Sequence, residues 1–292
     1  LLVLTIGGLV SGALVYWFAP EAEGHGTDAV IDAYHNRRGF IRARVPLIKM
    51  LTSAITLGTG GSGGREGPIA QIGAGFGSYL ATRLKLSDTD RRILVAAGLA
   101  AGIGAIFHAP LAGAIFAIEV LYRDPDFEAE ALIPAFIATA VSYCVFSLAI
   151  FAASDAWAFE PLFRIGADLR FNRPWLLLPL MALAAAMAVA SLVYVKSFYG
   201  ITLFFKRLRV PNHIKPAIGA LATGLVAVGG FYFLGWRSGS EAAHDSLSVL
   251  SFGYGFLQQV LDPTDPSRLL IPVLLVVGFG KIVTTSLTIG SG

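Results

Sequence analysis

Long runs of apolar residues without a charged side chain divide the sequence. A helix that crosses a bilayer core of about 30 Å takes roughly 20 residues, and five runs reach that length: 1–20, 93–118, 131–154, 174–195 and 216–236. Two shorter runs, 67–82 and 269–280, fall below it. Broken helices are tolerated at membrane depth where they are buried in protein or line a watery cavity. The pattern therefore predicts an all-α membrane protein in which some helices are broken.

The composition agrees with this prediction. Only 14% of the residues are charged, whereas an ordinary soluble domain has about 25%. Basic residues gather in three polar segments, 36–44, 83–92 and 206–215, which the positive-inside bias places on the cytoplasmic side. We expect the linker 155–173 on the opposite side. We expect an integral, multi-pass protein of a prokaryotic inner membrane that lies in the lipid bilayer and binds no nucleic acid.

Other residue types exclude several kinds of site. The single cysteine, Cys144, permits no internal disulfide. The five histidines are dispersed and form no metal-binding motif, so we expect no metal and no cofactor. An intramembrane enzyme acting on lipid phosphates would need a nucleophile or a metal cluster, and the sequence offers neither. The chain begins without Met or a basic signal region, so we expect a piece of a longer protein without a signal peptide.

The sequence contains an internal repeat. Residues 49–60, KMLTSAITLGTG, align without gaps to 281–292, KIVTTSLTIGSG, with a Lys, two Thr and two Gly identical. Upstream, IGGLVSGALV (6–15) is similar to IGALATGLVA (218–227), and each is followed by a short polar segment, 21–30 and 236–245. We predict one membrane domain over 1–292, with a first repeat at 1–152 and an incomplete second repeat at 174–292. Transporters built this way place the substrate between the repeats, where the N-termini of half-helices point at anionic groups.

A glycine-rich segment, GTGGSGGREGP at 58–68, is the main candidate for function. It contains G-x-G-x-x-G at Gly58, Gly60 and Gly63, but its flanks lack the strand that a dinucleotide site needs. It also lacks the Gly-Lys-Ser/Thr of a phosphate loop. Two interpretations stay open. The segment is either a flexible connector that ends in a helix-favouring acid, Glu66, or part of an anion site.

The anion interpretation rests on Pro68, since proline is favoured in the first turn of a helix. We predict a helix over 68–84 that begins just after Glu66 and Gly67. A helix N-terminus offers unpaired amides and about half a positive charge to an anion. The Glu66 carboxylate would compete with chloride there, closing the site when ionised and opening it when protonated. Arg65 either pairs with Glu66 or points to the interface.

The motif GREGP (64–68), followed by AAGLAAGIGAIFHAPLAGAIFAIEV (96–120), resembles the CLC family of chloride channels and proton-coupled chloride transporters. The resemblance implies a CLC-type two-repeat bundle of tilted and broken helices with an incomplete second repeat. It also implies a homodimer with one chloride pathway per subunit, and Glu66 as the gating glutamate. The anion-binding positions on this motif would be Gly64, Arg65, Gly67 and Pro68. The family's GxFxP segment falls beyond Gly292.

The sequence departs from the family pattern at three places. His25 in GHGTD (Gly24, His25, Gly26, Thr27, Asp28) stands where the family's GSGIP has a serine. The resemblance implies that Gly24, His25 and Gly26 are anion-binding positions. His25 would donate to the anion or carry charge there, close the pathway or alter selectivity, or be only a polar loop residue. His108 replaces the usual Asn of the FxAP motif, and we favour its interpretation as a polar residue at a helix start over a role in contacting the ion.

The third departure concerns proton transfer. Proton-coupled members carry a glutamate after FxIE, but here Glu119 is followed by Val120, which cannot carry a proton. Glu119 itself is either a functional intramembrane acid or an interfacial residue beside Arg123. We therefore predict a voltage-gated-type chloride channel that conducts passively. The alternative is a proton-coupled chloride antiporter, and transport of fluoride or nitrate is a variant of either.

Overall fold

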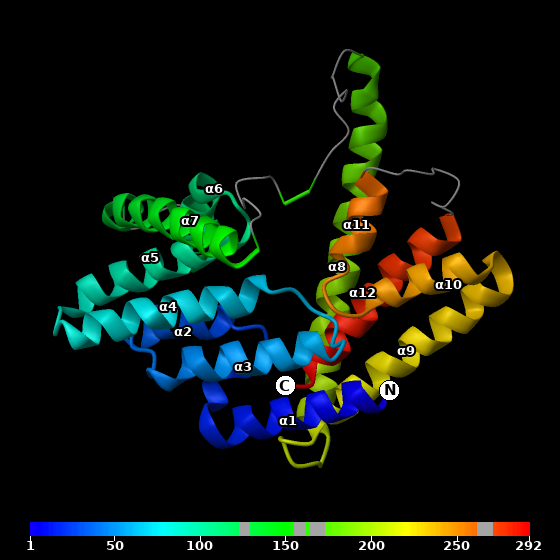
Figure 1. The fold of residues 1–292 in the computed structure, drawn as a ribbon, viewed down its shortest axis with the longest axis horizontal. Coiled ribbons are helices and arrows are strands. Elements are labelled where there is room, and N and C mark those ends of the chain that lie inside the picture. Colours follow the sequence, from blue (N-terminus) through cyan, green and yellow to red (C-terminus); the bar gives the residue numbers. More distant parts are fainter. Residues whose placement is uncertain (123–128, 155–161, 164–172, 262–270) are drawn as a thin grey trace. The chain divides into compact units, whose positions relative to one another are not determined.

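The structure is a computed structural model that describes residues 1–122, 129–154, 162–163, 173–261 and 271–292 (Figure 1). Over these residues the chain forms twelve α-helices and four short 3₁₀ helices and no strand, which confirms the all-α prediction. The α-helices are α1 (Leu2–Phe18), α2 (Thr27–Asn36), α3 (Arg44–Gly58), α4 (Glu66–Arg83), α5 (Asp88–Ile106), α6 (Pro110–Leu121), α7 (Leu132–Ser154), α8 (Leu177–Arg207), α9 (Lys215–Ser238), α10 (Ser240–Ser246), α11 (Tyr254–Leu261) and α12 (Ile271–Gly290). The 3₁₀ helices are η1 (Pro20–Ala22), η2 (Ala129–Ala131), η3 (Pro174–Leu176) and η4 (Leu247–Val249).

Four helices in the described part of the chain are long and apolar enough to cross a membrane. They lie at 132–153, 174–207, 215–238 and 271–290, so three of them coincide with predicted long runs. The fourth, α12, corrects the prediction of a short or broken helix at 269–280. It continues through Lys281 and a Thr-rich turn to Gly290 because these polar side chains find hydrogen bonds. Most of the linker 155–173 lies outside the described residues.

The predicted span 93–118 is wrong, since the chain breaks there into two helices. Helix α5 ends at Ile106 and α6 begins at Pro110. A residue before proline is biased out of the helical region, and Ala109 has φ −137° and ψ 74°. His108 adopts a left-handed φ of 54°. The prediction of His108 at a helix start is close, although Ala109 rather than His108 is the N-cap.

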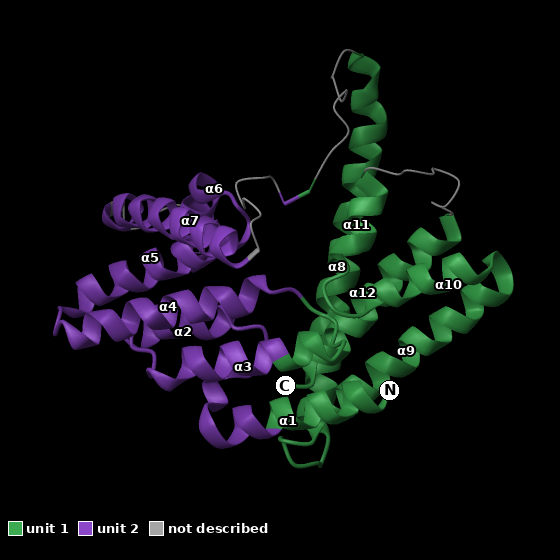
Figure 2. Cartoon of the chain, viewed as in Figure 1, with its two compact units in different colours: residues 1–12, 55–63, 163–292 green, residues 13–54, 64–162 purple. Residues whose placement is uncertain are grey.

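The chain divides into two compact units that are interleaved along the sequence (Figure 2). The first comprises residues 1–12, 55–63 and 163–292, and in it α12 packs against α8 and α9. The second comprises 13–54 and 64–162, and in it α5 packs against α4, α6 and α7. The glycine-rich segment passes from the first unit to the second between Gly63 and Gly64.

The aligned segments of the internal repeat have matching local structure. Helix α3 ends at Gly58 and α12 at Gly290, which are aligned positions. The Thr56 hydroxyl bonds that of Ser11 at 2.9 Å, and the aligned Thr288 hydroxyl bonds that of Thr223 at 3.1 Å. Ser11 and Thr223 are themselves aligned in the upstream pair. The boundaries 1–152 and 174–292 stay a prediction.

Candidate functional site

The candidate site begins where α4 starts. Helix α4 begins at Glu66, with Arg65 as its N-cap, so the predicted start at Pro68 is two residues late. Proline is tolerated anywhere in a first turn, whose amides lack intrahelical acceptors, and Pro68 occupies the third position. The Ile69 amide donates to the Arg65 carbonyl at 3.0 Å. Glu66 is therefore itself the first residue of the helix, at its N-terminus.

The side chain of Glu66 lies against the backbone just before its own helix. A methyl group placed on Gly64 would overlap the Glu66 carboxylate. The carboxylate thus folds back over Gly64 at the end of α4 where the helix dipole is positive. Any side chain at position 64 would displace it.

The two glycine motifs singled out in the sequence meet at this point. A methyl group on Gly67 would overlap the carbonyl oxygen of His25, and one on Gly26 would lie 2.9 Å from the Gly67 oxygen. Gly26 is also the N-cap of α2. Its φ is 105°, a value that residues other than glycine rarely adopt. The loop 24–26 and the first turn of α4 therefore touch through backbone, which only glycine permits.

Gln71, one turn further along α4, supports the same contact and was not anticipated from the sequence. It is only 2% exposed, and its Nε2 donates to the Glu21 carbonyl at 2.8 Å. Its Oε1 would lie 3.0 Å from a methyl group on Gly26. A lone glutamine in an apolar run was the available signal, because a buried amide usually has a structural partner.

A cavity of about 450 Å³ opens beside the start of α4. Its lining comes from three regions: the start of α2, the first turns of α4, and the end of α5 with α6. The lining residues are Thr27, Glu66, Gly67, Ala70, Ile103, Phe107, Ala109, Ala112, Gly113, Phe116 and Val120. Apart from Glu66 and Thr27 these side chains are apolar, so Glu66 is the one ionisable group among the described residues that line it.

The remaining predicted site residues are placed differently. His25 touches Gly67 through its backbone, while its Nε2 lies 3.5 Å from the Asp28 carboxylate. Val120 lines the cavity, whereas the adjacent Glu119 is exposed and does not. Arg65 is half-buried and is not a lining residue. The structure thus brings together Glu66, Gly67, Gly26, the His25 backbone and Val120.

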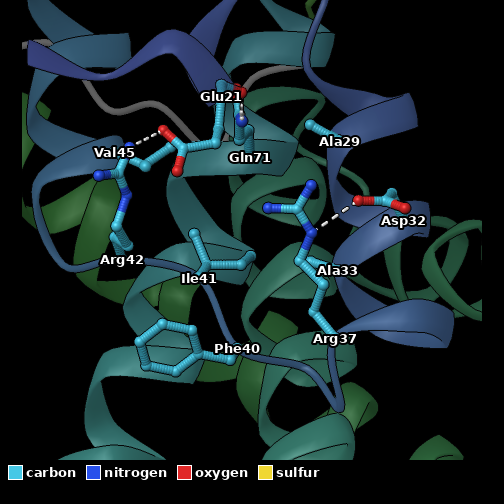
Figure 3. A pocket seen from close by; sticks show the side chains of 10 residues that line it. All are labelled: Glu21, Ala29, Asp32, Ala33, Arg37, Phe40, Ile41, Arg42, Val45 and Gln71. Carbon is cyan, nitrogen blue, oxygen red and sulfur yellow. Dashed lines mark hydrogen bonds and ion pairs between the residues drawn. The ribbon is translucent and has the colours of Figure 1, made fainter.

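A second cavity, of about 290 Å³, is lined by α2, the 37–42 loop and Gln71 (Figure 3). Two ion pairs cross its wall, Arg42 with Glu21, and Arg37 with Asp32 at 2.8 Å. Both acids lie outside the four candidate spans. Partial burial alone would raise the pKa of Glu21, but the Arg42 hydrogen bond and charge outweigh it, so that pKa is lowered. A hydrogen bond from Asn36, with the Arg37 charge, lowers the pKa of Asp32. The two arginines are therefore neutralised locally.

Comparison with known proteins matches nearly the whole chain to one protein family. The family model described as voltage gated chloride channel matches residues 7–292. An uncharacterized protein of Methanocaldococcus jannaschii is 30% identical, over 100% of this chain and 65% of its own length. A chloride/fluoride channel protein of Pseudomonas syringae pv. tomato is 25% identical, over 99% of this chain and 58% of its own.

A solved structure of a CLC-type fluoride/proton antiporter has the same fold. It superposes with a TM-score of 0.78 at 22% identity, covering 99% of this chain and 65% of the antiporter. Identity this low carries the fold alone, and it confirms the predicted CLC-type architecture. The chain spans somewhat less than two thirds of the length of each of these proteins.

Proposed function

The chain belongs to the voltage-gated chloride channel (CLC) family, and we propose that the full-length protein conducts chloride passively, with Glu66 as the gating carboxylate. The chain is an integral membrane protein. Our proposal extends to a homodimer with one pathway per subunit, in a prokaryotic inner membrane, working without a cofactor. Passage of fluoride is a variant of the same proposal, since a similar protein carries fluoride in its name.

One observation carries the proposal. The Glu66 carboxylate lies over Gly64 at the N-terminus of α4 and lines a cavity that is otherwise almost entirely apolar. Unpaired amides and the helix dipole attract negative charge there. An ionised carboxylate and a halide ion are therefore competitors for one place.

The gate follows from this competition. Ionised Glu66 keeps its charge at the helix end and excludes chloride. Protonated Glu66 has no charge to hold it there, so chloride takes its place beside the amides of α4 and the 24–26 loop. The backbone contact between Gly26 and Gly67 keeps these two groups of amides together. Low pH on the side that Glu66 faces would then raise conductance.

Val120 supports conduction without proton coupling. It lines the cavity with Glu66, and at that position proton-coupled relatives carry an acid. A valine neither binds nor releases a proton. The second candidate is a proton-coupled antiporter. It is favoured by the fold that the chain shares with a fluoride/proton antiporter. It would need a proton route that avoids Val120.

Anion flux from liposomes containing the full-length protein tests the role of Glu66. Glu66→Gln and Glu66→Ala should both still pass chloride, with flux that no longer depends on pH through this position, because neither side chain ionises. Glu23→Gln is the matched control, since Glu23 is an exposed carboxylate in the loop before α2. It should keep the wild-type pH profile. A wild-type profile in both Glu66 variants would remove Glu66 from the gate.

A further inference from the structure

Lys49 on α3 is a buried cation whose role the proposed gate does not explain. It is 4% exposed, and its Nζ donates to the carbonyl oxygens of Ala22 at 2.9 Å and Gly24 at 2.5 Å. No carboxylate of the described residues forms an ion pair with it. A buried ammonium is unfavourable unless hydrogen bonds compensate it. These two bonds therefore fix the loop that runs into α2.

Lys281 on α12 is aligned with Lys49 in the internal repeat, and it makes the same kind of contact. Its Nζ donates to the Ser251 carbonyl at 2.5 Å and lies 3.5 Å from the Val249 carbonyl. In both copies the two acceptors are two residues apart. In both copies the lysine is followed, three positions on, by a threonine that bonds the lysine's own carbonyl.

The backbones that the two lysines hold also match. A three-residue 3₁₀ helix, η1 or η4, precedes each loop. Left-handed φ follows at Gly24 and Gly26 (74° and 105°), and at Ser251 and Gly253 (52° and 72°). The next residue begins a helix, α2 at Thr27 and α11 at Tyr254. The counterpart of 20–27 is thus 247–254, which corrects the sequence alignment of the polar segments 21–30 and 236–245.

Each loop contacts a different part of the segment that contains Glu66. The loop held by Lys49 continues to His25 and Gly26, whose backbone touches Gly67. The loop held by Lys281 exchanges two backbone hydrogen bonds with the glycine-rich segment, from the Gly63 amide to the Ser251 carbonyl and from the Ser251 amide to the Gly60 carbonyl, both at 3.3 Å. Gly63 lies three residues before Glu66 in the chain.

We infer that Lys49 and Lys281 are a repeat-related pair of positioning residues for the gate. Lys49 holds the loop that meets the first turn of α4. Lys281 holds the loop that is hydrogen-bonded to the glycine-rich segment before Glu66. Each ammonium acts through backbone carbonyls and needs no contact with the anion. The inference rests on the proposed function of Glu66 and adds two residues to it, one in each compact unit.

Flux through the full-length protein, combined with hydrogen exchange, tests this inference. The variants are Lys49→Met and Lys281→Met, which remove the donor, and Lys49→Arg and Lys281→Arg, which keep it. The control is Lys196→Met, an exposed lysine on α8. Loss of a buried charged donor is expected to change function about tenfold or more.

The two Met variants should differ in what they change. Lys49→Met should raise the KM for chloride about tenfold and speed amide exchange in residues 22–27. Lys281→Met should flatten or shift the pH profile of flux and speed exchange in residues 60–66. Each Arg variant should recover most of the wild-type behaviour. Lys196→Met should match the wild type in both measurements.

Specific outcomes would overturn the inference. If the KM rises in Lys49→Met while exchange in 22–27 stays at the wild-type rate, the lysine acts as a remote charge and not through the loop. If both Met variants behave like Lys196→Met, neither lysine positions the site. Exchange needs no transport, so it still shows whether each lysine holds its loop if the wild-type protein passes no chloride and the proposed function fails.

Discussion

At the scale of single residues, the site depends on glycines that are required by contact and not by flexibility. Gly64 leaves room for the Glu66 carboxylate, and Gly67 for the His25 carbonyl. The sequence indicated that glycines would let the backbone approach an ion. It could not indicate that Gly26 and Gly67 instead allow the loop 24–26 to approach the first turn of α4, because that depends on contacts between distant segments.

Gly67→Ala should lower stability, because the new methyl group meets the His25 carbonyl and also stands directly before Pro68, where a Cβ disfavours the helical region. Overpacking of this kind costs about 1–3 kcal/mol, so the melting temperature in detergent should fall. Gly58→Ala is the control, since a methyl group there meets nothing within 4 Å. A Gly67→Ala protein as stable as Gly58→Ala would contradict the contact.

Sequence reasoning found Glu66, Gly67 and Val120, because each belongs to a short motif with a chemical meaning. It missed Gln71 as part of the site, and it noted Lys49 only as an identity within the repeat. Their role is to hold carbonyl groups of a loop more than 20 residues away in sequence. Every residue has a main-chain carbonyl, so the sequence does not show which carbonyls accept a hydrogen bond from Lys49 or Gln71.

At the scale of helices, the apolar runs predicted the existence of elements better than their ends. The run 93–118 was continuous in hydropathy, yet a proline and its preceding residue divide it between α5 and α6. The run 269–280 was too short by hydropathy, yet α12 extends beyond it, and the hydroxyls of Thr284 and Ser286 donate to backbone carbonyls one turn earlier in the helix. The backbone restriction before a proline decided the first case, and local hydrogen bonding decided the second.

The pairing of α4 with α5 depends on a close approach at Gly73 and Gly98. A methyl group on either residue would overlap the carbonyl oxygen of the other. Small residues let helix backbones come together in this way. Gly77 continues the seam, because a methyl group there would overlap the Leu94 carbonyl. These glycines therefore set the distance between the two helices that carry much of the second unit's core.

The same substitution should have opposite effects at two helical glycines. Gly73→Ala should lower stability by about 1–3 kcal/mol, since backbone must move to admit the methyl group. Gly200→Ala on α8 should raise it by about 0.5–1 kcal/mol, because a methyl group there meets nothing within 4 Å and alanine favours the helix. Thermal unfolding of both variants measures the difference. Equal effects in both would mean that Gly73 does not set the α4–α5 distance.

At the scale of the whole molecule, the duplication is clearer in hydrogen bonds than in sequence. Ser11 with Thr56 and Thr223 with Thr288 bond at matching positions, and the two aligned lysines hold matching loops. The sequence comparison placed the second polar loop too early because α10 has no counterpart between η1 and the end of α1. An extra helix shifts the register of everything that follows it in one copy.

The two copies have also diverged in what they carry. In the copy near α4, the held loop is followed by Thr27, which lines the cavity with Glu66. In the other, the Ser251 carbonyl also binds the glycine-rich segment through the Gly63 amide. One copy therefore contributes to the wall of the candidate site, and the other braces the chain that leads to Glu66. The two lysine-held loops are therefore alike in backbone structure but differ in what they contact.

Whether the whole protein couples chloride to protons is decided by one flux measurement, and Val120 gives the expected result. A tenfold chloride gradient provides about 1.4 kcal/mol per ion, enough to hold a proton gradient of about one pH unit in a one-for-one exchange. A passive pathway has no means to convert this energy, since Val120 binds no proton. With the membrane potential clamped to zero, an imposed chloride gradient should therefore move no protons uphill in liposomes that contain the wild-type protein. Glu66→Gln should likewise move no protons uphill in this assay, although the pH dependence of its chloride flux should differ from that of the wild type. Sustained proton movement against its gradient in the wild type, abolished in Glu66→Gln, would replace the channel with the antiporter and require a proton route around Val120.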